Sequence, residues 1–97
     1  MSVATYRRKK PPVRRREVWM QVKDGTQIRR RRQAKRYSQR ELAFLVRRSQ
    51  NTIHLIESGK LRSISEELAI AIAARLDRDW EELFIEHEVD PVMTHAS

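Results

Sequence analysis

Helix signals run through the middle of this sequence and leave few folds open to it. Between residues 26 and 86 there is no proline and only one glycine, Gly59. Proline and glycine are the residues that most often interrupt regular structure, so this stretch can hold several helices joined by short turns. The chain has 97 residues, which is enough for about one domain. We therefore predict a single all-α domain with five helices, and we exclude an enzyme with separate cofactor and substrate domains.

Capping signals place the helices. Ser38 and Glu41 have the spacing of a capping box, in which the serine hydroxyl and the glutamate carboxylate each accept from the other residue's backbone amide. Ser49 is a second cap, and Gly59 is a favourable residue just after a helix end. The predicted helices are 26–36, a short helix from 38, 50–58, a helix from 63 or 65 to 76, and a short one opened by a second capping box at 79–82.

Two segments beside the helices alternate as β-strands do. Residues 17–23 place Val18, Met20 and Val22 on one face, and residues 84–89 are stopped by Asp90 and Pro91. A single strand is not stable alone. We therefore predict that the two segments pair into a small two-stranded sheet, so that the domain spans residues 17–89 and residues 90–97 form a frayed tail.

The charge is distributed unevenly along the chain. The net charge is +8, but residues 1–36 have 14 basic and two acidic residues, whereas residues 63–97 have two basic and nine acidic residues. The basic part suits a polyanion such as nucleic acid. The acidic last third is a candidate surface for a protein partner.

The basic start is predicted to be a disordered arm over residues 1–16, because it is too charged and too rich in proline to bury a core. Such an arm ahead of a nucleic-acid module commonly lies along phosphates or in the minor groove. The alternative is a tail that only solubilises the protein. The arm residues in question are Arg7, Arg8, Lys9, Lys10, Arg14, Arg15 and Arg16.

Several classes of protein are excluded by what the sequence lacks. There is no cysteine, which excludes disulfide frameworks and thiolate zinc sites. No glycine-rich phosphate loop or paired nucleophile and base is evident, and His54 has no second ligand at helical spacing, so we expect no enzyme, cofactor or metal. The longest nearly apolar stretch, 68–74, is far shorter than the roughly 18 residues of a membrane span. We expect no membrane partner and a cytoplasmic protein.

The second and third predicted helices have a pattern typical of DNA recognition. On a helical wheel Ile53 and Ile56 lie on one side of the third helix, opposite the polar residues. Two short helices joined by a tight turn are the helix-turn-helix geometry, whose second helix enters the major groove by its N-terminal residues. Side-chain amides at that end can donate to and accept from adenine in bidentate fashion. The predicted base-reading residues are Gln50, Asn51, His54 and Leu55.

Three segments, SQRELA at 38–43, SQNTI at 49–53 and IESGK at 56–60, resemble the Cro and phage-repressor (XRE-type) helix-turn-helix family, within a match over about 26–84. The resemblance implies a regulator that binds an operator as a dimer, such as a phage-type repressor or Cro-like protein, located on the DNA of a bacterial host. It also implies that Gln39 bonds a phosphate and braces Gln50, and that Arg32 and Glu57 form a partly buried ion pair. A buried carboxylate would need such a cation in any case. Further backbone contacts are predicted for Arg40, Arg47, Arg48, Ser49, Thr52, Lys60 and Arg62.

The sequence departs from the family at the turn between the two helices. The family usually has glycine where this chain has Arg47 and an apolar residue where it has Arg48. Arg47 must therefore take a left-handed conformation or the turn must differ, and Arg48 can cover the core only with its aliphatic stem. Both residues add a cation at the phosphate-facing rim.

Two other functions fit the same sequence. An antitoxin of a toxin-antitoxin pair would use this fold and hold a protein through its acidic last third. An RNA-binding or ribosome-associated module would suit the arginine-rich arm, although few aromatic residues are available for base stacking; Trp19 and Tyr37 are the best candidates.

Overall fold

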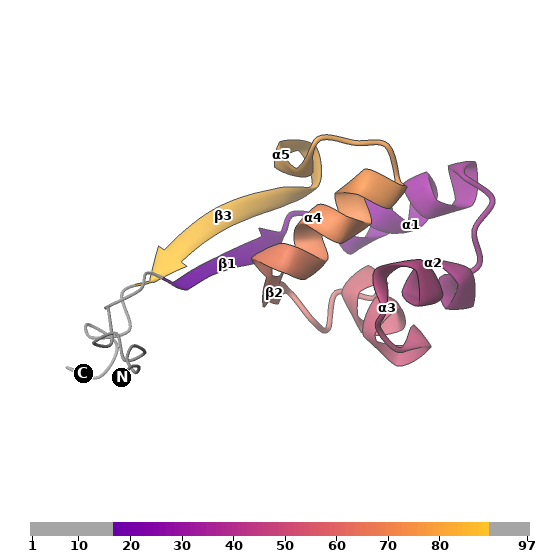
Figure 1. Cartoon of the computed structure of the whole chain (residues 1–97), viewed down its shortest axis with the longest axis horizontal. Helices are drawn as coiled ribbons and strands as arrows, with labels where there is room; N and C mark the ends of the chain where they lie inside the picture. Colours follow the sequence, from indigo (N-terminus) through magenta and orange to yellow (C-terminus); the bar gives the residue numbers. More distant parts are fainter. Residues whose placement is uncertain (1–16, 90–97) are drawn as a thin grey trace, which may run out of the picture.

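The computed structural model describes residues 17–89, so the predicted arm and the predicted tail lie outside the described residues. The order of elements is β1 (Glu17–Val22), α1 (Gly25–Ala34), α2 (Gln39–Val46), α3 (Gln50–Glu57), β2 (Ser63–Ser65), α4 (Glu66–Arg75), α5 (Trp80–Leu83) and β3 (Phe84–Val89). The helices pack together, while β1 and β3 run side by side and extend away from them (Figure 1). None of the helices between residues 17 and 89 has the length and apolar character that a membrane crossing requires.

The pairing of the two terminal strands is confirmed. β1 and β3 are antiparallel, with Val22 opposite Phe84 and Glu17 opposite Val89. The sheet nevertheless has three strands in the order β2-β1-β3, not the two predicted. β2 has only three residues, with Ile64 opposite Met20 of β1. Three residues are too few to show a period of two, so its sequence gave no strand signal.

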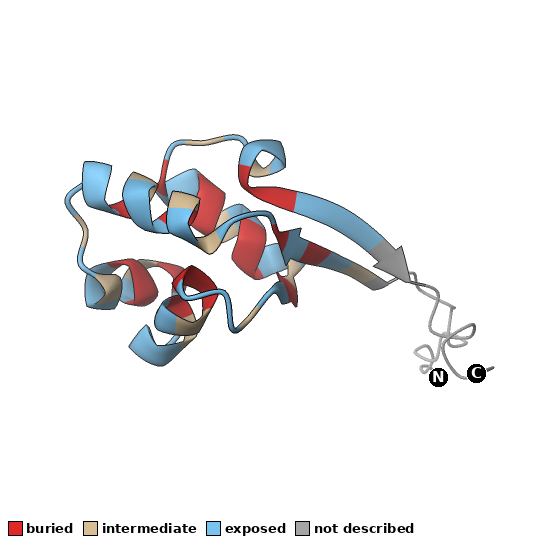
Figure 2. Ribbon diagram, turned by 180° about the vertical axis from the view of Figure 1, so that it is seen from behind, coloured by how far each residue is buried: buried red, intermediate tan, exposed pale blue. Residues whose placement is uncertain are grey.

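One core joins the sheet to the helices. The inner face of the sheet and the inner sides of the helices are buried, and the outer surfaces are exposed (Figure 2). The largest fully buried side chains are Met20, Ile28, Leu42, Ile53, Ile56, Ile72, Leu83 and Phe84. The core therefore draws on both terminal strands as well as on the helices, and the sheet is an integral part of the domain.

The helix boundaries differ from the predicted ones at a few points. α1 stops at Ala34 because Arg36, predicted to be helical, has a left-handed backbone with φ 63°. α4 begins after Ser65, whose hydroxyl accepts from the Leu68 amide at 3.1 Å. The second capping box is not formed, because Asp79 precedes α5 without a side-chain cap bond. The first box is formed in both directions, at 3.0 and 2.8 Å between Ser38 and Glu41.

The start of α1 is pressed against the end of α3 at Gly25. A Cβ atom there would fall 2.7 Å from the carbonyl oxygen of Glu57 and still closer to that of Ile56. Both obstacles are backbone atoms, which cannot rotate aside as a side chain could. Glycine at this position thus allows the close approach of the two helices.

Gly25→Ala should therefore lower the free energy of unfolding by about 1–3 kcal/mol, the usual cost of overpacking, and shift the end of α3. Urea denaturation measures the first effect, and amide chemical shifts at Ile56 and Glu57 measure the second. Arg30→Ala, at an exposed position of the same helix, is the control and should change stability by less than about 0.5 kcal/mol. Equal stability of the two variants would contradict the close approach.

Candidate nucleic-acid interface

The two helices of the predicted helix-turn-helix, α2 and α3, are joined by a three-residue turn. Of the two conformations considered for this turn, the structure has the one in which Arg47 is left-handed. Arg47 has φ 62° and ψ 46°, and the Arg48 amide donates to the Ala43 carbonyl at 2.9 Å. Ala43 is buried, which lets α2 and α3 approach. The Arg48 guanidinium donates to the Arg47 carbonyl at 3.1 Å. Both arginines are exposed at the turn.

The wheel drawn for α3 is confirmed. Ile53 and Ile56 are 1% and 0% exposed, whereas Gln50, Asn51 and His54 are exposed. The helix begins at a Ser49 cap, whose hydroxyl accepts from the Thr52 amide at 3.1 Å. The other predicted residues on or beside α3 are placed as follows: Leu55 and Thr52 are half-buried, and Lys60 and Arg62 are exposed in the segment after the helix.

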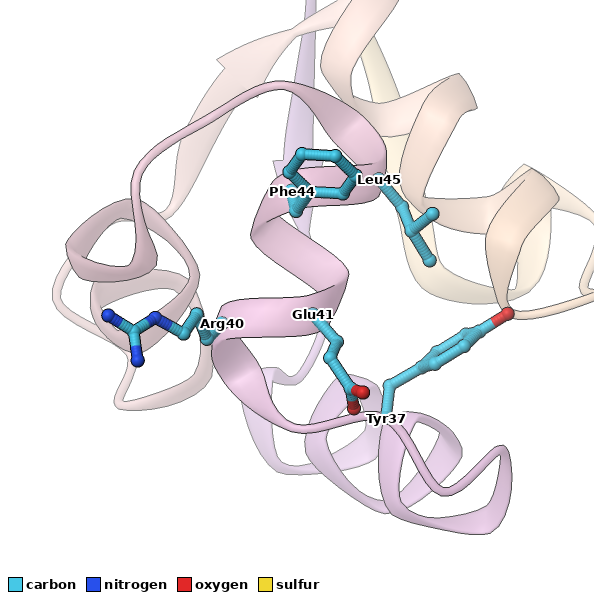
Figure 3. A pocket seen from close by; sticks show the side chains of 5 residues that line it. All are labelled: Tyr37, Arg40, Glu41, Phe44 and Leu45. Atoms are coloured by element: carbon cyan, nitrogen blue, oxygen red, sulfur yellow. The ribbon is translucent and has the colours of Figure 1, made fainter.

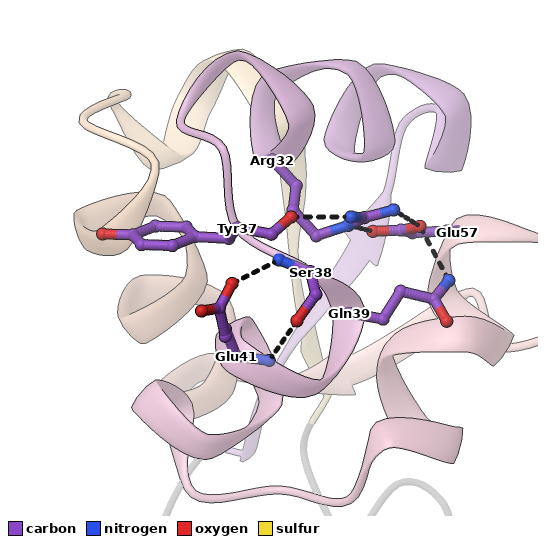
Figure 4. Close-up of polar contacts among 6 residues, drawn as sticks. All are labelled: Arg32, Tyr37, Ser38, Gln39, Glu41 and Glu57. Carbon is purple, nitrogen blue, oxygen red and sulfur yellow. Dashed lines mark hydrogen bonds and ion pairs between the residues drawn. The ribbon is translucent and has the colours of Figure 1, made fainter.

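A buried ion pair fixes α3 to α1. The Arg32 guanidinium donates from Nε and Nη2 to the two carboxylate oxygens of Glu57, at 2.6 and 3.0 Å (Figure 4). The Arg32 and Glu57 side chains are only 9% and 3% exposed. The remaining Nη1 of Arg32 donates to the carbonyl of Tyr37 at 2.8 Å. The pair implied by the family resemblance is thus present, fully buried and bidentate.

Gln39 completes this network. Its side-chain amide donates to Oε1 of Glu57 at 3.0 Å (Figure 4), and within residues 17–89 no hydrogen bond joins it to Gln50. The brace onto Gln50 that the resemblance implied is thus not among the hydrogen bonds of the described residues, and the Gln39 amide donates to the Glu57 carboxylate instead. The contact with the Tyr37 carbonyl has no sequence signature, since it depends only on backbone position.

An exposed apolar groove lies on the outer side of α2. It has a volume of about 550 Å³ and is lined by Tyr37, Arg40, Glu41, Phe44 and Leu45 (Figure 3). Phe44 is 80% exposed, although its residue type is usually buried. Arg40, one of the residues predicted to contact the DNA backbone, is exposed at the rim of this groove. Its guanidinium is directed away from the other lining side chains (Figure 3).

Comparison with known proteins agrees with this geometry. The helix-turn-helix family model HTH_3 matches residues 28–83. The chain belongs to this helix-turn-helix family. It is thus of the DNA-binding, transcription-regulator type, with α2 and α3 as the two helices of the motif. No curated protein matches the chain.

A solved structure is also similar. The restriction-modification controller protein C.AhdI from Aeromonas hydrophila is 33% identical, and the match covers 63% of this chain and 91% of that one with a TM-score of 0.57. The similarity thus extends over nearly the whole of the controller protein, while more than a third of this chain lies outside it.

Glu57→Ala should lower the free energy of unfolding by about 3–5 kcal/mol, because it leaves the Arg32 cation buried without a partner. Denaturant titration followed by circular dichroism measures this. Lys35→Ala is the control: Lys35 pairs with Asp77 at the surface, and exposed pairs stabilise little. A loss for Glu57→Ala no larger than that for Lys35→Ala would show that the buried pair does not hold α3 in place.

Replacing Arg47 should separate backbone strain from DNA contact. Arg47→Gly relieves a left-handed conformation and should raise the unfolding free energy by about 1 kcal/mol, whereas Arg47→Ala should not. If Arg47 contacts a phosphate, both variants lose that contact, and the slope of log K against log salt becomes shallower by about 0.9. Thermal unfolding and salt-dependent DNA titrations measure the two effects, and an equal stability for the two variants would contradict the strain.

Proposed function

We propose that the protein is a sequence-specific regulator of transcription that binds double-stranded DNA with α3 in the major groove. The observation that carries this proposal is the exposed amide pair, Gln50 and Asn51, at the N-terminus of a helix whose opposite side is fixed by a buried ion pair. Amide side chains at this end of a recognition helix can bond adenine in bidentate fashion. His54 and Leu55 lie one turn further along α3 and complete the base-reading set.

Backbone contacts surround this face in the proposal. Exposed residues at the start of α2, at the turn and after α3 supply them: Arg40, Arg47, Arg48, Lys60 and Arg62. Ser49 and Thr52 at the start of α3 share a hydrogen bond of 3.0 Å. Gln39, the first residue of α2, lines a hollow together with His54 of α3. The seven cations of residues 1–16 would add phosphate or minor-groove contacts.

The protein is further proposed to bind its operator as a homodimer. Helix-turn-helix proteins of this size read two half-sites about one helical turn apart, so that the symmetry of the operator mirrors that of the dimer. Selection of bound sequences from a random duplex pool tests both points, because a dimer selects a palindromic motif and a monomer selects a single half-site.

A more specific role is favoured by one observation. The similarity to a restriction-modification controller protein covers 91% of that chain at 33% identity. We therefore propose control of a restriction-modification system as an alternative to a phage-type repressor. The selected operator discriminates the two: a copy upstream of a restriction or methyltransferase reading frame supports the controller, and copies confined to prophage genes support the repressor.

Gln50→Ala and Asn51→Ala should each reduce discrimination between the operator and a single-base mismatch by about 1–3 kcal/mol, while helicity and binding to random duplex persist. Titrations with the operator, its mismatched variants and random duplex measure this. Lys60→Ala is the matched control, since a lost phosphate contact weakens all sequences equally. Uniform losses for the amide variants would contradict base reading, and stronger binding to structured RNA of equal charge would favour an RNA-binding protein.

A further inference from the structure

A polar hollow lies beside the recognition helix, between α1, the start of α2 and the end of α3. Its volume is about 360 Å³. It borders the DNA-facing side of the protein, because one of its walls is His54, an exposed residue of α3. The lining residues are Arg29, Arg32, Gln39, His54, Glu57 and Ser58.

Most charge in this hollow is already neutralised. Arg32 and Glu57 form the buried bidentate pair, and the third donor group of Arg32 is used by the Tyr37 carbonyl. Arg29 is different: within residues 17–89 it has no ion pair and no side-chain hydrogen bond. The hollow therefore has one uncompensated full charge, a positive one.

Apart from Arg32, the other cations on or near α1 do not line the hollow as Arg29 does. Lys35 pairs with Asp77, and this pairing raises the pKa of Lys35 and lowers that of Asp77. The pKa of Asp24 is lowered mainly by the hydrogen bond that its carboxylate accepts from the Thr26 side chain. The exposed Arg30 is near enough to Asp24 to add to this lowering. Of the α1 arginines that the structure describes, only Arg29 and Arg32 line the hollow. Of these two, Arg32 is held by Glu57 and the Tyr37 carbonyl, so that Arg29 is the one available to an anion.

The donors in the hollow suit an oxyanion. A guanidinium offers several N–H groups in a planar fork that matches phosphate oxygens. The Gln39 amide uses one proton for Glu57 and keeps a second. A tetrahedral anion here would contact the helix-turn-helix and α1 at the same time.

We propose that Arg29 binds a phosphate of the DNA backbone in this hollow, together with the remaining amide proton of Gln39. This proposal rests on the proposed function, and it extends the DNA-binding surface to α1, outside the two helices of the motif. α1 then has two roles three residues apart: Arg32 fixes the recognition helix from inside the protein, and Arg29 binds the DNA beside it.

The test compares Arg29→Ala with Arg30→Ala in the full chain, on the selected operator and on random duplex. Arg29→Ala should make the slope of log K against log salt shallower by about 0.9, so that the affinity ratio between 50 and 200 mM salt falls by about 3.5-fold. The loss should be equal on both DNAs, because a phosphate carries no sequence information. Arg30→Ala should leave the slope unchanged, and Arg29→Lys should restore most of it.

Phosphate ethylation identifies the bound group. In the normal protein, ethylation of one particular phosphate per half-site should weaken binding. In Arg29→Ala, ethylation of the same phosphate should no longer change the affinity. Equal slopes for Arg29→Ala and Arg30→Ala, in a protein whose base discrimination depends on Gln50, would overturn this inference alone. No binding of duplex DNA by the normal protein would overturn the proposed function as well. Because Arg29 is exposed, thermal unfolding of Arg29→Ala should match that of the normal protein.

Discussion

The buried pair between Arg32 and Glu57 is the interaction on which the rest of the structure depends. It joins α1 to the last turn of α3, and through Gln39 and the Tyr37 carbonyl it also holds the start of α2 and the segment before it. A carboxylate this deeply buried is costly unless it is paired and its lone pairs are satisfied. Four hydrogen bonds of this network meet these conditions, so α2 and α3 keep one relative orientation.

The fixed orientation has a direct consequence for recognition. The exposed face of α3 presents Gln50 and Asn51 only because Ile53 and Ile56 are held in the core. Gly25 allows the same packing from the other end, where the start of α1 touches the last carbonyls of α3. A preorganised helix loses less conformational entropy when it binds, and the binding free energy is then available for discrimination between bases.

The helix ends show how this protein combines charge with tight turns. Arg36, Arg47 and Asp77 all have positive φ angles at positions where glycine is the least strained residue. Among the described helices, α3 alone is followed by a glycine in this conformation, Gly59 with φ 85°. At Arg47 the strained residue is an exposed cation in the turn of the motif.

The sequence by itself determined the helix-turn-helix: the cap residues at Ser38 and Ser49, the buried isoleucines and the exposed amides are local features with a helical period. It also predicted the pairing of residues 17–23 with 84–89, because alternation identified both strands. Tertiary structure alone decided the third strand, the orientation of Gln39 toward Glu57, the close approach at Gly25 and the position of Arg29 beside His54. Each of these depends on residues more than ten positions apart in the sequence, where periodicity and capping rules contain no information about distance.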